Sequence, residues 1–293
     1  MSTSLRLLGW LARRRLRLLH ALGGVLGWAA YLLSPSYRRR LDANAALAGV
    51  SASDRRAAVA EAGRLVAELP RLWLRPRHEP IADPVRWEGA ELIERLHEAG
   101  RGLVMLTPHI GSFEVAAQAY AERFGARWPA TVLYRPARKA WLRELEEAAR
   151  ARPALATAPA SLAGVRQLMR ALRRGETVGL LPDQVPPAGM GVWAPFFGRP
   201  AYTMTLAARL VQQTGAAVGV LCCERLPRGA GYVVRASPLP EPLPERAGGD
   251  DEAWQQAAAA VVNRSMETVI RRLPRQYLGG YHRYKSPRGA EAA

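Results

Sequence analysis

The stretch Thr107-Pro108-His109-Ile110-Gly111-Ser112-Phe113-Glu114 follows the apolar run Gly-Leu-Val-Met-Leu at residues 102–106. An aliphatic and β-branched run that ends at a proline predicts a buried strand that opens into a turn. Gly111 disfavours a helix and Ser112 is a good N-cap, so we expect a helix to begin directly after the turn. The sequence therefore predicts a strand, a short turn and a helix over residues 112–124.

His109 and Glu114 are the candidate catalytic pair in this stretch. Their spacing would put the two side chains on different faces of one continuous helix, but a histidine in the turn can meet a glutamate in the first helical turn. A carboxylate on one imidazole nitrogen fixes the tautomer and raises the basicity of the other nitrogen. Such a pair can act as a general base toward a hydroxyl group. The alternative is a structural histidine that caps a backbone group at the end of the strand.

Strand and helix patterns alternate along the chain after a proline-rich connector at residues 75–84. This alternation predicts an α/β domain with a largely parallel sheet flanked by helices, in which sites gather at the carboxyl ends of the strands. The predicted strands are 102–107, 130–134, 177–181, 216–224 and 231–236. The predicted helices are 53–73, 88–99, 112–124, 138–150, 161–173, 203–214 and 250–272.

Polar residues follow two further predicted strands, as His109 follows the first. Arg135 lies in Tyr-Arg-Pro, and an arginine there can hold a phosphate or carboxylate with two parallel hydrogen bonds. The alternative, which the many arginines of this chain favour, is one more surface arginine. Asp183 and Gln184 lie in Pro-Asp-Gln, and the aspartate has three possible uses: to orient a base, to pair with Arg135, or to cap a turn.

Residues 191–202 form a glycine- and proline-rich segment with several aromatic side chains. This is more aromatic surface than a solvent-exposed loop normally carries. The segment is therefore expected either to pack as a buried cover or to line a channel for an apolar ligand such as an acyl chain.

The net charge is +17, and arginine supplies nearly all of the positive charge because Lys139 and Lys285 are the only lysines. No zinc-finger spacing or RNA-recognition signature accompanies this charge, so we expect anionic lipid or an anionic substrate as the partner and no nucleic acid. Cys222 and Cys223 make no metal-ligand pattern, and we expect no metal. Neighbouring cysteines on a strand point to opposite faces, so a disulfide between them is not expected.

Arginine clusters flank an apolar stretch at residues 18–33. This stretch is shorter than the roughly 20 residues that cross a bilayer comfortably. Aromatic residues and arginines at its borders favour a helix that lies in the membrane interface or inserts shallowly, although a marginal span, a signal sequence and a buried soluble helix are alternatives. We therefore predict an N-terminal membrane anchor or interfacial helix over residues 1–41, followed by one domain over residues 42–293.

Four sequence blocks occur in a fixed order: His-x4-Glu after a strand, Tyr-Arg-Pro, Pro-Asp-Gln, and Pro-Phe-Phe-Gly-Arg-Pro-Ala at residues 195–201. Together they resemble the bacterial lipid A biosynthesis acyltransferases, the late lauroyl and myristoyl transferases of the lysophospholipid acyltransferase superfamily. The resemblance extends from the N-terminal anchor to the Gln-Tyr-Leu segment near Tyr277. Family members often read Gly-Asn-Trp-Glu where this chain has Gly-Ser-Phe-Glu, and Ala-Arg-Lys at residues 137–139 replaces a segment that usually contains asparagine.

The resemblance implies a glycerolphosphate acyltransferase-like fold and an enzyme on the cytoplasmic face of the bacterial inner membrane. Such an enzyme moves a fatty acyl chain from acyl carrier protein, or from coenzyme A, to a hydroxyl of a lipid A precursor, with the thioester as co-substrate and no cofactor. The resemblance makes His109 the base, Glu114 its orienting carboxylate, and Arg135, Asp183 and Gln184 substrate-binding residues. Amides at the start of the helix over residues 112–124, or Arg135, are candidate donors to the oxyanion.

Two other functions remain open from the sequence. The same chemistry can act on a lysophospholipid or on another glycolipid or aminolipid. Alternatively, the chain can be a basic peripheral membrane-binding protein without catalysis, in which the histidine and glutamate are structural.

Overall fold

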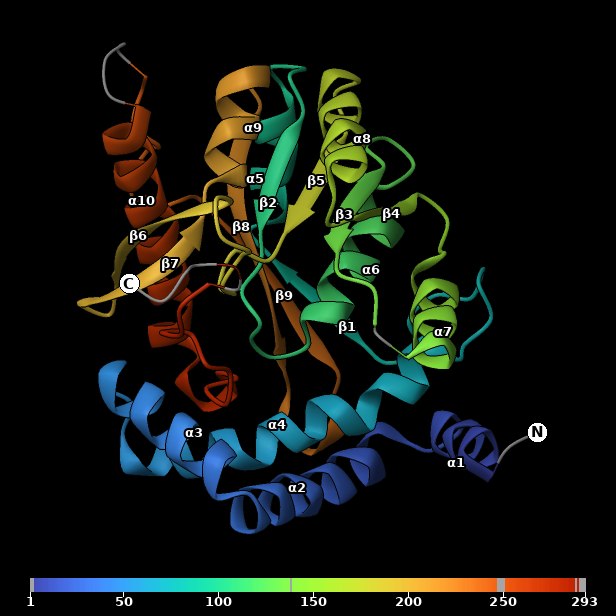
Figure 1. The fold of residues 1–293 in the computed structure, drawn as a ribbon. Helices are drawn as coiled ribbons and strands as arrows, with labels where there is room; N and C mark the ends of the chain where they lie inside the picture. Colours follow the sequence, from blue (N-terminus) through green and yellow to red (C-terminus); the bar gives the residue numbers. More distant parts are fainter. Residues whose placement is uncertain (1–2, 138, 247–250, 288, 290–293) are drawn as a thin grey trace.

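A computed structural model describes residues 3–137, 139–246, 251–287 and 289, and its centre is a seven-stranded sheet (Figure 1). The strands of this sheet are β1 (Val85–Glu88), β2 (Leu103–Leu106), β3 (Ala130–Tyr134), β4 (Leu155–Pro159), β5 (Thr177–Leu180), β8 (Ala217–Arg225) and β9 (Tyr232–Ser237). They are arranged in the order β1-β9-β8-β2-β5-β3-β4. All neighbouring pairs are parallel except β8 and β9. The predicted α/β class and largely parallel sheet are confirmed.

Helices cover both faces of the sheet and one of its ends (Figure 1). They are α1 (Thr3–Ala12), α2 (Leu16–Leu33), α3 (Pro35–Leu47), α4 (Ala52–Trp73), α5 (Ala90–His97), α6 (Phe113–Phe124), α7 (Ala140–Arg150), α8 (Leu162–Arg173), α9 (Leu206–Thr214) and α10 (Asp251–Arg272). Helix α3 runs across residue 41, and the division of the chain at that residue stays a prediction.

Strand β2 has hydrophobic contacts on both of its faces, which explains why its sequence is a continuous apolar run. Val104 and Leu106 face one core, which α8, α9 and α10 cover. Leu103 and Met105 face the other core, which α5 and α6 cover. The alternation follows from the period of two in a strand. The turn that carries His109 therefore begins at the end of the most deeply buried part of the sheet.

The adjacent cysteines also lie in separate cores, as predicted. Cys222 belongs to the core under α10 and Cys223 to the core under α6, and both thiols are free and buried. Burial raises the pKa of the Cys222 thiol to about 11. Neither cysteine is therefore a reactive thiolate at neutral pH.

The aromatic segment at residues 191–202 is not a loop but a hairpin of β6 (Gly191–Phe196) and β7 (Arg199–Met204). Phe196 is 1% exposed and packs in the core with Val262 and Met266 of α10. Asn263 of α10 also donates a hydrogen bond to the Pro195 carbonyl oxygen. The sequence left open whether this segment packs as a buried cover or lines a channel for an apolar ligand. The structure shows the buried cover.

Helices α2 and α4 lie side by side across the end of the sheet (Figure 1). Their backbones are in contact, because a Cβ on Gly63 would lie 2.0 Å from the Gly23 carbonyl oxygen, and one on Gly27 would lie 2.2 Å from the Val59 carbonyl oxygen. Small residues spaced four apart permit such close helix packing.

The outer face of α2 is apolar and exposed to solvent. Helix α2 is long and apolar enough to cross a membrane, by length and composition, and 33% of its residues are buried within the protein. Its exposed large apolar side chains are Leu18, Leu22, Val25, Leu26, Leu32 and Leu33. An exposed apolar stripe of this size is typical of a surface that binds a partner or a membrane.

The contact between α2 and α4 predicts the effect of a larger residue at its centre. Gly63→Leu places a side chain where backbone atoms now lie, so we expect the free energy of unfolding to fall by about 1–3 kcal/mol. Thermal unfolding followed by circular dichroism in a fixed detergent measures this change.

Gly24→Ala is the matched control, because a Cβ there has no neighbouring atom closer than 3.7 Å. Alanine also favours the helix over glycine by about 1 kcal/mol, so this variant should be as stable as the wild type or more stable. Equal melting temperatures for Gly63→Leu and the wild type would contradict the observed packing.

Candidate active site

The parallel pairing of β2 and β5 brings His109 and Asp183 together. Leu106 of β2 pairs with Leu180 of β5. His109 and Asp183 each follow their paired leucine by three residues, and a proline precedes each of them. Two turns that leave neighbouring parallel strands at the same register carry their side chains to the same edge of the sheet. This equal spacing is present in the sequence, and it identifies the pair once β2 and β5 are known to be neighbours.

Asp183 holds both the ring and the backbone of His109. Its Oδ1 accepts a hydrogen bond from the Nδ1 of His109 at 2.7 Å, and its Oδ2 accepts one from the main-chain N–H of His109 at 2.8 Å. The side chain of Asp183 is 8% exposed and that of His109 is 24% exposed. Burial acts to raise the pKa of Asp183, but its interactions with His109, and to a smaller extent with Arg283, lower this pKa below its usual value. The carboxylate is therefore ionised at neutral pH and fixes the tautomer that carries its proton on Nδ1.

Gln184 and Phe113 contact the same imidazole. The Nε2 of Gln184 lies 3.1 Å from the Nε2 of His109, and an amide nitrogen can only donate there. The Nε2 of His109 is therefore the acceptor, which agrees with a proton on Nδ1. The ring of Phe113 lies edge-on to the imidazole, with the ring centroids 4.9 Å apart. The Nε2 of His109 is therefore the basic atom of the ring, and a substrate hydroxyl would have to displace the Gln184 amide to reach it.

Glu114 makes no hydrogen bond to His109 and instead pairs with Arg150 at the end of α7. The predicted contact between Glu114 and His109 is therefore wrong, because the carboxylate that binds the His109 ring is that of Asp183. Glu114 lies in the first turn of α6, where it faces α7. Burial acts to lower the pKa of Arg150, but the neighbouring Glu114 carboxylate raises it above its usual value.

Arg135 lies apart from these groups. Its side chain is exposed, and it makes no hydrogen bond or ion pair with any residue that the structure describes. Of the three predicted substrate-binding residues, the structure brings Asp183 and Gln184 to His109 and leaves Arg135 on the surface. Of the three uses considered for Asp183, the structure shows the orientation of His109.

Residues from distant parts of the chain hold the turn after His109, and sequence analysis did not identify them. The Gly111 N–H donates to the Gln276 carbonyl oxygen at 3.1 Å, and the Ser112 N–H donates to the Cys223 carbonyl oxygen at 2.8 Å. Both amides are therefore already occupied and are not free to bind an oxyanion. Gly111 has a φ of +56°, and a Cβ on it would lie 2.1 Å from the Cys223 oxygen, so the position requires glycine.

An apolar cavity of about 40 Å³ lies between the sheet and α6 and is partly open to solvent. Thr107 and Phe113, which flank His109 in the sequence, lie at its lining. The remaining lining residues are Met105, Ala117, Tyr120, Ala130, Val132, Thr177, Gly179, Leu181 and Leu221. In the described part of the chain, no group of three or more His, Cys, Asp or Glu side chains can hold a metal ion.

Polar groups meet at the end of this cavity where β5 begins. The hydroxyls of Tyr120 and Thr177 are 2.6 Å apart, and the Nε2 of His97 lies 2.9 Å from the hydroxyl of Thr177. Burial lowers the pKa of His97 to about 4, so this histidine is neutral at physiological pH. The cavity is therefore apolar along its walls and ends at a set of hydrogen-bonded side chains.

Three relatives are similar to part of this chain. The lipid A biosynthesis lauroyltransferase of Escherichia coli (strain K12) is 27% identical over 205 residues, which are 69% of this chain and 63% of the relative. The lipid A biosynthesis palmitoleoyltransferase of the same organism and a lipid A biosynthesis acyltransferase of Shigella flexneri are each 27% identical over 200 residues, 68% of this chain and 61% of the relative. The chain thus spans between 61% and 63% of the length of these relatives.

The family profile described as bacterial lipid A biosynthesis acyltransferase matches residues 5–286. This match includes the N-terminal helices, the central sheet, the turn with His109 and the C-terminal helix. Because it covers nearly the whole chain, the protein belongs to the bacterial lipid A biosynthesis acyltransferase family.

Proposed function

We propose that this protein transfers a fatty acyl chain from an acyl carrier protein thioester to a hydroxyl of a lipid A precursor. The observation that carries the proposal is the position of His109, whose Nδ1 is bound by Asp183 and whose neighbours Thr107 and Phe113 line an apolar cavity. A base beside an apolar cavity suits the attack of an alcohol on a fatty acyl thioester. The names of the relatives, which are lauroyl and palmitoleoyl transferases, support the same reaction class.

In the proposed reaction, the Nε2 of His109 takes the proton of the acceptor hydroxyl as its oxygen attacks the thioester carbonyl carbon. The C–O bond forms, the tetrahedral intermediate collapses, and the C–S bond breaks. The proton then passes from Nε2 to the departing thiolate sulfur. The ionised Asp183 stabilises the imidazolium that forms between these steps. A thioester is already activated, so a base is sufficient and no acyl-enzyme intermediate is required.

Ser112 takes no part in this mechanism as a nucleophile. Its side chain is fully buried, and its hydroxyl donates a hydrogen bond to Glu68 at 2.6 Å. The main-chain amides in the first turn of α6 are the proposed donors to the oxyanion, since the Arg135 side chain lies on the surface. The role of Glu114, which the family resemblance makes catalytic, is part of the proposal that the variants below examine.

The acyl chain is proposed to lie in the cavity between the sheet and α6. The cavity runs from Leu181 to Thr177, and four residues of a strand extend about 13 Å. At about 40 Å³ the cavity is smaller than a fatty acyl chain, so the side chains that line it would have to move to admit one. The hydrogen-bonded groups of Tyr120, Thr177 and His97 would then limit the length of the acyl chain.

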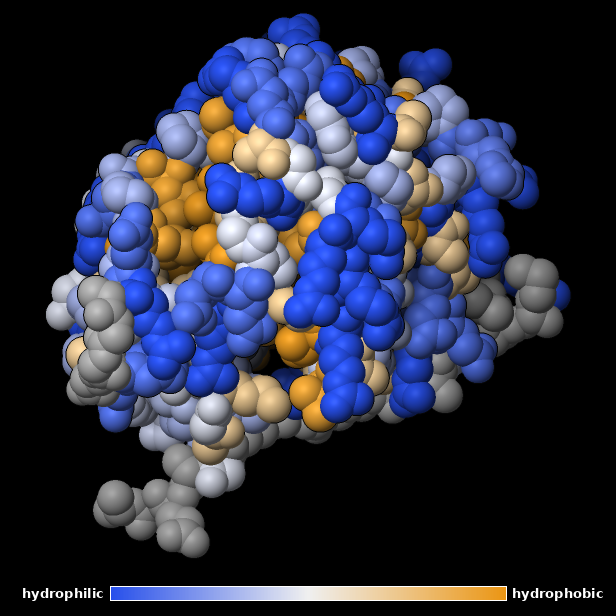
Figure 2. Space-filling view, turned by 90° about the horizontal axis from the view of Figure 1, so that it is seen from above, coloured by the Kyte–Doolittle hydropathy of each residue, from blue (hydrophilic) through white to orange (hydrophobic). Residues whose placement is uncertain are grey.

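The exposed apolar face of α2 is proposed to lie in the cytoplasmic leaflet of the bacterial inner membrane. Exposed arginines flank this face, as expected for contact with anionic lipid: Arg13, Arg15, Arg17, Arg38 and Arg39. The opposite face of the molecule, away from α2 and α4, is covered mainly by hydrophilic side chains (Figure 2). This polarity supports a protein that rests on the membrane through its N-terminal helices.

The proposed mechanism predicts the behaviour of two active-site variants. His109→Ala removes the base, and Asp183→Asn removes the charge that fixes its tautomer, so each should lower kcat by about 10²–10⁴. The assay uses purified full-length protein, a lipid A precursor and acyl carrier protein thioesters, with mass spectrometry of the acylated lipid. Full activity of His109→Ala in a folded protein would contradict the proposal.

Glu114→Gln provides the comparison between the two carboxylates, because it leaves the bond between Asp183 and His109 in place. An active Asp183→Asn together with an inactive Glu114→Gln would assign the orienting role to Glu114 instead. Lysophospholipid acceptors are assayed in parallel. Transfer to these lipids, with none to the lipid A precursor, would contradict the proposed acceptor.

The proposed acyl site predicts that a larger residue at the middle of α6 shortens the preferred chain. Ala117→Phe fills part of the cavity and should shift the preferred donor by about two carbons. Each methylene that is no longer buried costs about 0.8 kcal/mol, so the ratio of kcat/KM for the shorter and longer donors should change about tenfold. The ratio of kcat/KM for the two donors needs no separate folding control, because a folding defect lowers the rates with both donors equally. An unchanged ratio would exclude this cavity as the acyl site.

A further inference from the structure

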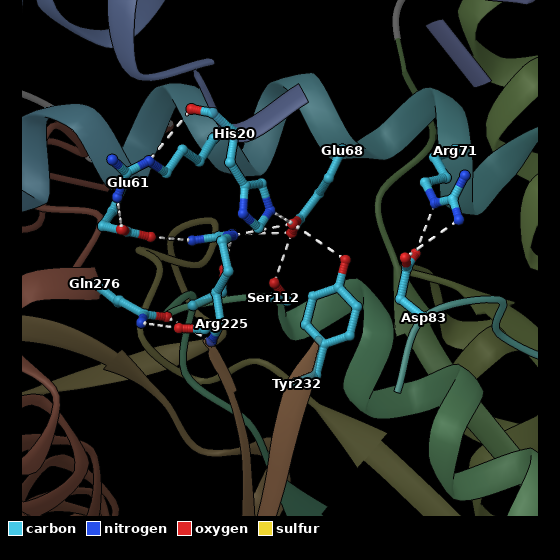
Figure 3. A network of polar contacts seen from close by, with 11 residues as sticks. His20, Glu61, Glu68, Arg71, Asp83, Ser112, Arg225, Tyr232 and Gln276 are labelled. Carbon is cyan, nitrogen blue, oxygen red and sulfur yellow. Dashed lines mark hydrogen bonds and ion pairs between the residues drawn. The ribbon is translucent and has the colours of Figure 1, made fainter. Parts of the chain in front are cut away.

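The turn after His109 is connected to a buried ion pair between α4 and the end of β8 (Figure 3). The Nη2 of Arg225 donates to the carbonyl oxygen of Gly111 at 3.2 Å. The Oε1 of Glu68 accepts a hydrogen bond from the Ser112 hydroxyl at 2.6 Å. Together with the two occupied amides described above, these bonds hold the main-chain polar groups of Gly111 and the N–H and hydroxyl of Ser112. The path of the chain between His109 and α6 is therefore fixed.

The carboxylate of Glu68 is the centre of this network (Figure 3). Arg225 donates to it twice, from Nε to Oε2 and from Nη2 to Oε1, each at 2.9 Å. The hydroxyl of Tyr232 donates to Oε2 at 3.2 Å, and the Nε2 of His20 contacts the same oxygen at 3.0 Å. Four side chains from α2, β8, β9 and the turn before α6 thus meet on one carboxylate.

The ion pair is almost entirely removed from solvent. The side chains of Glu68 and Arg225 are 2% and 1% exposed. Burial acts to raise the pKa of Glu68, but Arg225 and the hydrogen bonds from His20 and Ser112 lower it to about 2. Glu61 on α4 also faces Arg225, at 2.6 Å from its Nη1. A buried ion pair is often no more stabilising than apolar residues of the same size, so its use here points to a role in fixing geometry.

His20 connects the network to the apolar helix. It is the residue of α2 that reaches Glu68, and it is 5% exposed. The Nε of Arg64 on α4 also donates to the carbonyl oxygen of His20 at 3.3 Å. Displacement of α2 from α4 would therefore remove one of the groups that hold the Glu68 carboxylate in place.

We propose that Glu68 and Arg225 are positioning residues for His109, and that His20 makes this positioning depend on the docking of α2 against α4. The inference rests on the proposed acyl transfer. Neither Glu68 nor Arg225 contacts the imidazole, and both act through the turn at Gly111 and Ser112. A base that moves by about 1 Å can lose on the order of 10²-fold in rate.

The test separates positioning from folding by measuring kcat, KM and the melting temperature in the same full-length variants. Ser112→Ala removes a single link between the turn and Glu68, and Glu68→Gln removes the charge of the pair. We expect kcat to fall about 10–100-fold in both, with KM for the acyl donor within about twofold of the wild type. Ser112→Ala should also retain the melting temperature, because the ion pair stays intact.

The ion pair of Arg71 and Asp83 provides the matched control (Figure 3). Arg71 lies on α4 close to Glu68 in the sequence, and its Nε donates to the Oδ2 of Asp83 at 2.6 Å. This pair makes no contact with the turn after His109. Asp83→Asn should therefore leave kcat within about twofold of the wild type, even where it lowers the melting temperature.

The part of the proposal that concerns α2 has its own pair of variants. His20→Ala removes the contact between α2 and Glu68 and should lower kcat, whereas His20→Gln keeps a side-chain donor and should restore most of it. Full activity in His20→Ala would overturn the role of α2. Full activity in both Ser112→Ala and Glu68→Gln would overturn the positioning role, as would an equal loss of kcat in Asp83→Asn.

A measurement without substrate separates this inference from the proposed function. In protein labelled with ¹³C-histidine, the His109 ring signal is assigned by its loss in His109→Ala. Its chemical shift should change in Ser112→Ala and Glu68→Gln and stay unchanged in Asp83→Asn. If the wild type lacks transferase activity and these shifts still occur, the positioning role stands and the proposed function fails. Unchanged shifts in an active enzyme would overturn the positioning role alone.

Discussion

The hydrogen bond between the Nδ1 of His109 and the Oδ1 of Asp183 is the contact on which the rest of the site depends. It forms because β2 and β5 are parallel neighbours in register, with Leu106 opposite Leu180. A shift of one strand by one residue would separate the two side chains and would exchange the residues that this strand places in the two cores. The hydrophobic burial that fixes the sheet register therefore also fixes the contact between His109 and Asp183.

The second constraint on this site comes from the end of the sheet, where α2 and α4 lie (Figure 1). The carboxylate of Glu68 joins α2, α4, β8 and β9 to the turn after His109. The helix with the exposed apolar face is thus connected to the turn after His109 by two successive hydrogen bonds, one between His20 and Glu68 and one from Ser112 to Glu68.

Local sequence patterns predicted the central part of the fold and failed at its edges. The five predicted strands correspond to β2, β3, β5, β8 and β9, because strands within the sheet carry recognisable apolar runs. The strands that were missed, β1 and β4, lie at the two edges of the sheet. Strand β1 alternates between half-buried and exposed residues, and β4 ends in a proline, so neither has a continuous apolar run. The hairpin at residues 191–204 was missed because glycine and proline in its sequence suggested a loop.

Prediction of the candidate site from local sequence was limited in the same way. His109 was found from its place after a strand, but the nearby Glu114 was chosen as its partner over Asp183, which lies 74 residues away. The equal distance of His109 and Asp183 from their strand ends becomes a signal once β2 and β5 are known to be neighbours, and strand order is not a local property. The sequence contains no comparable signal for Glu68 and Arg225. A glutamate in an alanine-rich helix, such as Glu68, is normally predicted to be exposed to solvent. Their role depends on packing between segments 157 residues apart.

The tautomer of His109 tests the central claim most directly. In protein labelled with ¹⁵N-histidine, the ring nitrogen shifts distinguish a protonated nitrogen from an unprotonated one, and the His109→Ala variant assigns the signals. Above the pH at which the ring becomes neutral, we expect the proton on Nδ1, bound to Asp183, and an unprotonated Nε2. A neutral ring that carries its proton on Nε2 would contradict the account, because that nitrogen could not accept a proton from the acceptor hydroxyl.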